Sequence, residues 1–282
     1  MSVYDNKPDQ FLVKVPPPTG TTKDEIYCAG FELKKWRAEQ LAYHLIEWLP
    51  EYALPEDELR MHHGNVVSKL TQAAVRVYTT SKYAGRGEVG EIAIHAICRG
   101  FFNTIPLSPR VFYKSATNEV IKAFDMVHVR FPDPDSIELW LGESKLYSSP
   151  SKAIGDAITS VKKHLEDGFL KNQKLLLGPQ IPKTTPRYDE ISKLFKSGTS
   201  LDDLISQSVF VIGIACESEA ALAAKVADPA YVLATYGEMA YLRKRLSDSG
   251  LGDQVRVLLI YVPLASKKLL VNAFDKRLKA LQ

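Results

Sequence analysis

Three charged residues on one predicted hairpin are the part of this chain best suited to chemistry. Asp125 lies in a strand-like run, 123–131, and Glu143 and Lys145 lie at the end of a second run, 137–145. The prolines and aspartates between the two runs predict a turn. In a symmetric hairpin without a bulge, Asp125 lies directly opposite Glu143, with Cβ atoms about 4.5–5.5 Å apart. Lys145 shares the face of Glu143, because side chains alternate along a strand.

Two carboxylates held opposite one another favour a cation between them. Like charges directly opposite destabilise a sheet, so we expect Asp125 and Glu143 to bind a divalent metal ion. Mg²⁺ (or Mn²⁺) takes oxygen ligands in octahedral geometry, and phosphate oxygens can complete its shell. The ion would polarise a phosphoryl oxygen and activate a water, and Lys145 could orient that water or stabilise charge on the phosphorus. The hairpin therefore predicts a metal site suited to phosphodiester hydrolysis.

The helix predicted over 88–102 offers further acids. Glu88 and Glu91 lie in its first turn, where the helix dipole favours negative charge. Either acid could reach the hairpin, and Glu91 is favoured because the apolar stretch that buries the helix begins directly after it. The predicted catalytic residues are therefore Asp125, Glu143, Lys145 and Glu91. The predicted metal ligands are Asp125, Glu143, Glu91 and Glu88.

Two histidines lie near these residues in the sequence. His128 is an odd number of residues from Asp125, so a regular strand turns it to the opposite face, where a packing role is expected. His95 lies one helical turn beyond Glu91 and shares its face, so both packing and support of the site remain open for it.

The remaining pattern predicts an α/β fold with a mixed sheet flanked by helices. A polar, turn-rich stretch at 79–87 separates a mainly helical N-terminal region, 1–80, from a main body, 81–282. The predicted helices cover 31–48, 63–78, 88–102, 151–174, 218–226, 229–247 and 267–281. The predicted strands cover 11–15, 110–115, the two arms of the hairpin, 209–216 and 255–262.

The charge balance neither requires nor excludes a nucleic-acid partner. The 282 residues carry 36 basic and 33 acidic side chains, for a net charge of +3. A phosphate-binding surface must therefore come from local clustering. The helix after the hairpin is basic, and Lys152, Lys162 and Lys163 are its candidates for contact with DNA. A solvated helix face explains these lysines equally well.

Several classes of protein are disfavoured by what the sequence lacks. The three cysteines form no CxxC pair, which disfavours zinc ribbons and iron–sulfur clusters and suits a reducing compartment. No apolar run is long enough for a membrane span, and residues 1–8 do not resemble a signal peptide, so a cytoplasmic location is expected. No GxxxxGK[ST] motif is present, so ATP hydrolysis by this chain is not expected.

The order of a helical Glu, a strand Asp and a Glu-x-Lys on the partner strand resembles the PD-(D/E)xK nuclease superfamily. The resemblance covers about 87–175 and implies a restriction-endonuclease-like mixed sheet flanked by helices. The helix after the Glu-x-Lys lacks the Gln and Tyr of RecB-like nucleases. That departure argues against an exonuclease of the RecB type.

Three segments, 86–95, 124–128 and 141–147, resemble the HamA family more closely, the nuclease subunits of bacterial Hachiman anti-phage systems. The resemblance implies a DNA nuclease held by a helicase partner, HamB, and released on infection. It implies catalytic roles for Asp125, Glu143 and Lys145, assisted by Glu91 or Glu88. Two alternatives remain open, namely a stand-alone restriction-type endonuclease and a catalytically inactive nuclease-fold subunit that binds or scaffolds.

Overall fold

The structure, a computed structural model, describes residues 3–20, 23–80, 87–108 and 124–282. The strand predicted over 110–115, and most of the stretch 79–87, lie outside the described residues. None of the helices in the described ranges is long and apolar enough to cross a membrane.

Seven strands in the described residues form one mixed sheet, in the order β1-β2-β9-β8-β7-β6-β5. The four central strands run parallel to one another, whereas β1 at one edge and β6 and β5 at the other pair antiparallel. The strands are β1 (Val13–Lys14), β2 (Glu25–Cys28), β5 (Ile105–Pro106), β6 (Met126–Arg130), β7 (Glu138–Tyr147), β8 (Ser208–Glu217) and β9 (Val257–Leu264). The expected mixed sheet is therefore present. Nine of the ten residues of β8 are buried, as its continuous apolar sequence predicts.

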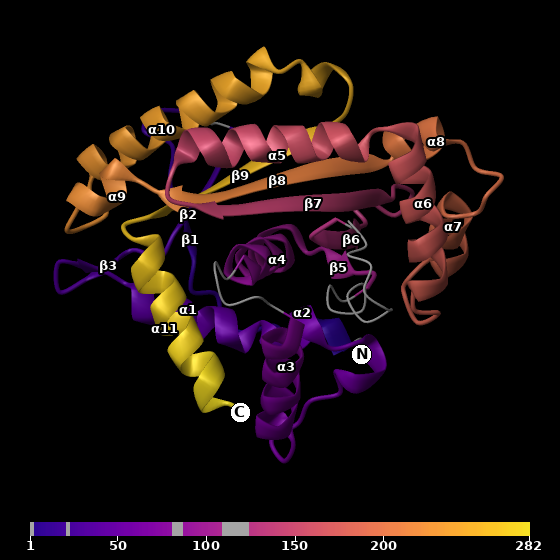
Figure 1. Cartoon of the computed structure of the whole chain (residues 1–282), viewed down its shortest axis with the longest axis horizontal. Helices are drawn as coiled ribbons and strands as arrows, with labels where there is room; N and C mark the ends of the chain where they lie inside the picture. Colours follow the sequence, from indigo (N-terminus) through magenta and orange to yellow (C-terminus); the bar gives the residue numbers. More distant parts are fainter. Residues whose placement is uncertain (1–2, 21–22, 81–86, 109–123) are drawn as a thin grey trace.

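Helices cover both faces of this sheet (Figure 1). One face carries α5, with α10 beside it, and the other carries α4, with α1, α2, α3 and α11 beyond it. The α-helices are α1 (Ala38–Glu47), α2 (Leu49–Ala53), α3 (Val66–Thr80), α4 (Glu88–Phe102), α5 (Pro150–His164), α6 (Asp167–Leu177), α7 (Tyr188–Leu194), α8 (Leu201–Ser206), α9 (Glu219–Ala223), α10 (Pro229–Asp248) and α11 (Lys267–Ala280). Short 3₁₀ turns are η1 (Val3–Asp5), η2 (Glu56–Glu58), η4 (Gly178–Gln180) and η5 (Leu251–Asp253).

Side chains alternate along β7 and pack into two separate cores. Leu139 and Leu141 pack into the core beneath α5, whereas Trp140 and Leu146 pack into the core around α4. Odd-numbered residues of β7 therefore face α5, and even-numbered residues face α4. This division decides which of the charged residues can meet.

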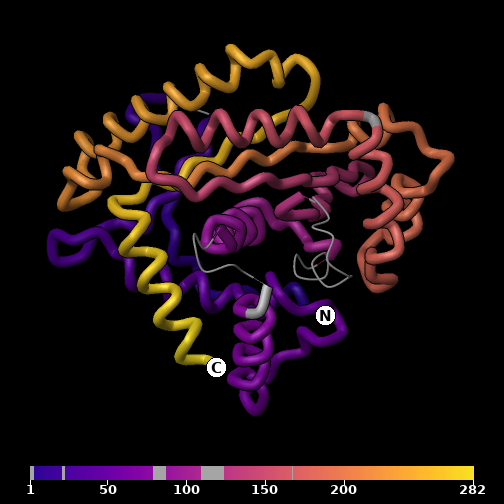
Figure 2. The backbone as a smooth tube through the Cα atoms, in the orientation of Figure 1, coloured from indigo at the N-terminus to yellow at the C-terminus, as the bar shows by residue number. Residues whose placement is uncertain are grey.

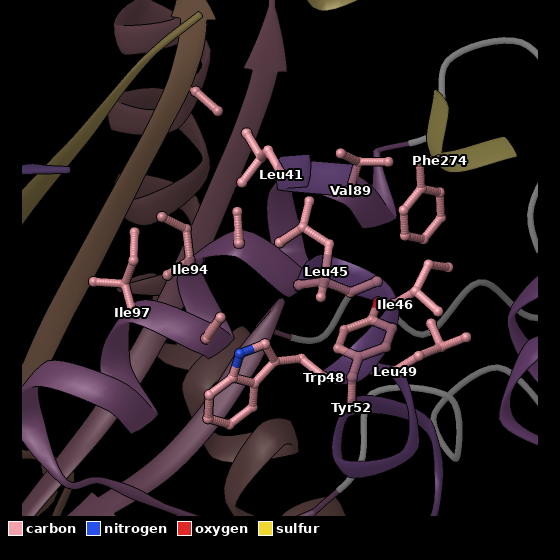
Figure 3. Packing of buried hydrophobic residues seen from close by; sticks show 14 of the residues in the cluster. Leu41, Leu45, Ile46, Trp48, Leu49, Tyr52, Val89, Ile94, Ile97 and Phe274 are labelled. Atoms are coloured by element: carbon pink, nitrogen blue, oxygen red, sulfur yellow. The ribbon is translucent and has the colours of Figure 1, made fainter. Parts of the chain in front are cut away.

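The described part of the N-terminal region contributes strands as well as the helices predicted for 1–80. β1 and β2 extend the main sheet, and β2 pairs directly with β9 from the C-terminal part of the chain. The path of the backbone shows α1 and the C-terminal helix α11 side by side (Figure 2). Side chains of α1, α2 and α4, and of Trp48 between α1 and α2, interdigitate in one buried cluster (Figure 3), which includes Leu41, Leu45, Tyr52, Ile94 and Ile97.

Two predicted helices differ from the structure. The helix predicted over 31–48 begins only at Ala38, because the residues before it form the hairpin of β3 (Phe31–Glu32) and β4 (Lys35–Trp36). Leu33 and Lys34 form its two-residue turn with φ of 47° and 62°, and Leu33 is 91% exposed rather than part of an apolar stripe.

The helix predicted over 151–174 is two helices, α5 and α6. The backbone of Glu166 is extended, with ψ of 134°, which ends the first helical run and redirects the second.

The close approach of α4 to β8 depends on a glycine. A Cβ added at Gly213 would lie 2.1 Å from Cγ1 of Ile94, far inside contact distance. We therefore expect Gly213→Ala to lower the free energy of unfolding by about 1–3 kcal/mol, measured by urea denaturation. Adding Ile94→Ala should relieve the clash, so the double variant should lose less than the sum of the two single variants.

Gly155 in α5 is the matched control, since a Cβ there would meet nothing within 4 Å. Gly155→Ala should be neutral or stabilising by up to about 1 kcal/mol. Equal losses at Gly155 and Gly213 would mean that the contact with Ile94 does not set the position of α4.

Candidate active site

The predicted hairpin is confirmed, and its register is as predicted from Met126 onward, whereas the predicted pair of Asp125 with Glu143 lies outside the ladder. β6 and β7 pair antiparallel, from Met126 with Gly142 to Arg130 with Glu138. Asp125 directly precedes Met126 on one strand, and Glu143 directly follows Gly142 on the other. Its N–H donates to the carbonyl of Gly142 (2.8 Å), which departs from the regular ladder, and its Oδ2 accepts from the N–H of Ser144 (2.9 Å). The Asp125 carboxylate therefore lies where the pairing of the two strands ends.

Glu143 and Lys145 project together from the α5 face of the sheet. Glu143 is 5% exposed, and its Oε1 accepts a hydrogen bond from the Lys145 ammonium. Burial lowers the pKa of Lys145, but the carboxylates of Glu143 and Asp125 outweigh it, and the pKa lies above its ordinary value. Lys145 is therefore a protonated cation at neutral pH, which suits charge stabilisation rather than proton abstraction. The hydrogen bond from Ser144, which lies between Glu143 and Lys145, places the Asp125 carboxylate beside this pair.

His164 joins this group from the last turn of α5. Its Nδ1 lies 3.9 Å from Oε2 of Glu143. The imidazole stacks on Phe169, with ring centroids 4.3 Å apart, and meets the ring of Phe124 edge-on at 4.5 Å. Sequence reasoning did not select His164, since no local spacing links it to the hairpin. It reaches Glu143 because α5 folds back over β7.

Glu88 and Glu91 lie on the other side of the sheet. A Cβ added at Gly90 would come within 2.9 Å of Oγ of Ser144, so the first turn of α4 packs directly on β7. Ser144 is even-numbered and faces α4, whereas Glu143 faces α5. The Tyr52 hydroxyl donates to Oε2 of Glu91 (2.5 Å), and Glu88 is buried. The predicted roles of the two helical acids in metal binding remain predictions.

The described side chains contain no cluster of three or more His, Cys, Asp or Glu residues placed to hold a metal ion. The two carboxylates beside Lys145 are hard oxygen donors, which fit Mg²⁺ or Mn²⁺ in kind. With Asp125 and Glu143 as the protein ligands, water and phosphate oxygens would supply the rest of the shell, as is usual for Mg²⁺.

The three lysines predicted to bind DNA lie at opposite ends of α5. The Nζ of Lys152, in the first turn, lies 5.5 Å from the centroid of the Tyr147 ring. Lys162 and Lys163 are exposed in the last turn, where the Lys162 ammonium donates to the carbonyl of Ser249 (2.7 Å). The structure therefore places Lys152 apart from the other two.

A buried polar network occupies the α4 face of the sheet. His95 on α4 lies 3.1 Å from Nε2 of His128 on β6, and His128 in turn lies 2.7 Å from the Thr104 hydroxyl. Glu51 on α2 contacts both His95 (3.1 Å) and the Arg99 guanidinium. The predicted opposite-face position of His128 is therefore confirmed, and both histidines belong to this network.

The fold and the site define a mixed α/β protein that carries an Asp directly before one strand and a Glu-x-Lys on the neighbouring strand. The sequence profile of the HamA family matches residues 8–278, and the chain belongs to the HamA family. The chain is similar to Anti-bacteriophage protein A of Escherichia coli (strain K12), at 23% identity over 214 residues. That match covers 70% of this chain and 36% of the relative, so the chain spans only about a third of the relative's length. No solved structure matches the chain.

Proposed function

We propose that this HamA-family protein is a metal-dependent DNA nuclease of anti-phage defence, with a PD-(D/E)xK-type site. The observation that carries the proposal is the grouping of Asp125 and Glu143 around a protonated Lys145 at the end of the β6–β7 ladder. Two acids that can bind a metal ion, with a cation beside them, are groups able to catalyse phosphodiester hydrolysis.

Asp125 and Glu143 would hold Mg²⁺ or Mn²⁺, which supplies a Lewis acid and a water of lowered pKa when bound. Ser144 fixes the Asp125 carboxylate through its backbone N–H, so that ligand is held in place before any cation arrives. The Lys145 ammonium, held by Glu143, is positioned to stabilise the negative charge that grows on the phosphate oxygens. The raised pKa keeps this ammonium charged throughout the neutral range.

Family membership and the name of the E. coli relative support a role in anti-phage defence. We extend the proposal to a helicase partner of the HamB kind, to phage or cellular DNA as substrate and to action in the cytoplasm. A stand-alone restriction-type endonuclease and an inactive scaffolding subunit are the competing functions.

Purified protein is expected to degrade linear and plasmid DNA in the presence of Mg²⁺ or Mn²⁺, followed on agarose gels. EDTA should abolish the degradation, and added Mg²⁺ should restore it, since the bound metal supplies the Lewis acid and the water of lowered pKa. Smear-like products support the proposal, and a discrete band pattern on plasmid DNA would favour the restriction-type function. DNA that is bound but never cut, with either metal and with the partner removed, would favour the scaffolding function.

A further inference from the structure

An aromatic residue with two lysines lies at the end of the strand that carries Glu143 and Lys145. Tyr147 is the last residue of β7, two residues beyond Lys145, so it shares the α5 face about 6–7 Å further along. Its ring is half-buried. This is the carboxyl end of the parallel strands, where α5 and α11 begin (Figure 1), and ligands of open α/β sheets bind at this edge.

The two lysines come from different helices. The ammonium of Lys152, at the start of α5, lies 5.5 Å from the centroid of the Tyr147 ring, and that of Lys267, at the start of α11, lies 5.9 Å from it. Lys152 is exposed and Lys267 is half-buried. Two ammoniums beside one ring repel each other, whereas the charge of Lys145 is balanced by Glu143. An anion between them would relieve that repulsion.

The acidic neighbours hold this arrangement in place. Burial, and then a hydrogen bond to Asp156 on α5, raise the pKa of the Tyr147 hydroxyl. Glu217 at the end of β8 accepts the backbone N–H of Lys267 and so fixes the first turn of α11. Both carboxylates are engaged with the tyrosine edge and the helix start, and both lysine ammoniums lie over the Tyr147 ring. Lysine side chains are long and flexible, so phosphates can draw the ammoniums from the ring and leave its face to a base.

We propose that Tyr147, Lys152 and Lys267 form a platform for single-stranded DNA beside the catalytic group, an inference that rests on the proposed nuclease function. Surfaces that bind single strands combine an aromatic ring, on which an unpaired base stacks, with cations that contact the backbone phosphates. A duplex keeps its bases stacked inside and offers such a ring no partner. The platform therefore selects an unwound strand and leads it toward Glu143 and Lys145.

The test measures DNA binding in the Glu143→Gln background, so that cleavage cannot interfere. A fluorescently labelled single strand and the matching duplex are titrated and followed by anisotropy. Replacing both Lys152 and Lys267 with Ala should weaken single-strand binding at least tenfold and lower the slope of log K against log salt by about 0.7 per lost phosphate contact. Tyr147→Ala should weaken single-strand binding about 5- to 150-fold and leave the duplex nearly unaffected, whereas Tyr147→Phe should bind as the parent does.

Lys244 and Lys279 provide the matched control, because both are exposed lysines in ion pairs with an acid one turn away, Asp248 and Asp275. Their double Ala variant removes the same charge and should bind as the parent does. The platform would be overturned if both double lysine variants lost the same binding affinity. It would also be overturned if Tyr147→Ala weakened duplex and single-strand binding equally. Thermal melting checks that each variant is folded. If the platform variants lose single-strand binding but the protein never cuts DNA, the platform is supported and the proposed nuclease function is rejected. If the protein cuts DNA and the platform variants bind as the parent does, the nuclease function is supported and the platform is rejected.

Discussion

Glu143→Gln and Lys145→Met are each expected to lower the rate of DNA cleavage by about 10²–10³-fold or more. Glu143→Gln removes one of the two carboxylates that would hold the metal. Lys145→Met removes the cation whose raised pKa keeps it charged beside those carboxylates. The measurement is the single-turnover rate on a labelled DNA fragment at saturating Mg²⁺.

The two variants should differ in metal binding, which separates their roles. Glu143→Gln should raise the Mn²⁺ concentration needed for binding, measured by calorimetry, because it loses a charged ligand. Lys145→Met should bind Mn²⁺ at least as tightly as the parent, because it frees the Glu143 oxygen that the ammonium occupies. A result with the opposite order would show that Glu143 is not a metal ligand.

Lys244→Ala is the control, since this lysine is exposed and is paired with Asp248 on the surface of α10. It should cut DNA at the parental rate. Thermal melting must accompany Lys145→Met, because Glu143 is buried and loses its partner. Folded variants of Glu143 and Lys145 that cut normally would place the active site elsewhere in the protein.

The hairpin could be predicted from the sequence because its signals are local. Side chains alternate along both strands, and the prolines and aspartates between them define the turn, so the register from Met126 with Gly142 onward follows from counting. The bounds of α4 follow in the same way, from acids in its first turn and an apolar stripe. These local signals bring Asp125, Glu143 and Lys145 together without any knowledge of the tertiary fold.

The face on which a helix docks is not a local property, and there the sequence prediction was limited. Glu91 was assigned to the metal site because it precedes an apolar stretch, and that assignment remains a prediction. In the structure, Gly90 and Gly213 allow α4 to pack on the Ser144 face of the sheet, opposite Glu143. His164 was missed for the converse reason, because only the return of α5 over β7 brings it to Glu143.

The turn between β3 and β4 shows a different limit. A helical stripe was inferred partly from Leu33, yet Leu33 and Lys34 adopt positive φ. Side chains such as these seldom adopt that conformation, so nothing in their type signals a turn. Periodicity alone therefore extended the helix by about two turns.

The buried pair of Glu51 and Arg99 is expected to be the most sensitive point for stability. Arg99 is 2% exposed, and its guanidinium contacts Glu51 as well as the backbone carbonyls of Tyr4 and Thr104. Glu51→Gln leaves this buried cation without its counter-charge, so the free energy of unfolding at pH 7 should fall by about 3–5 kcal/mol. Urea denaturation measures the loss. Asp248→Asn, which breaks an exposed pair with Lys244, should cost less than about 1 kcal/mol.

The cost of Glu51→Gln should also depend on pH, in a direction that the pKa of Glu51 sets. Burial raises this pKa, but His95 and Arg99 outweigh burial and hold it below its ordinary value of 4.5. A carboxylate with a lowered pKa stabilises the fold fully above about pH 4.5, and that stabilisation is lost as the pH falls through the lower folded value. The difference between parent and Glu51→Gln should therefore be constant near neutrality and shrink in acid. A difference that instead grows as the pH falls would show that Glu51 is protonated in the folded protein and does not serve as the counter-charge of Arg99.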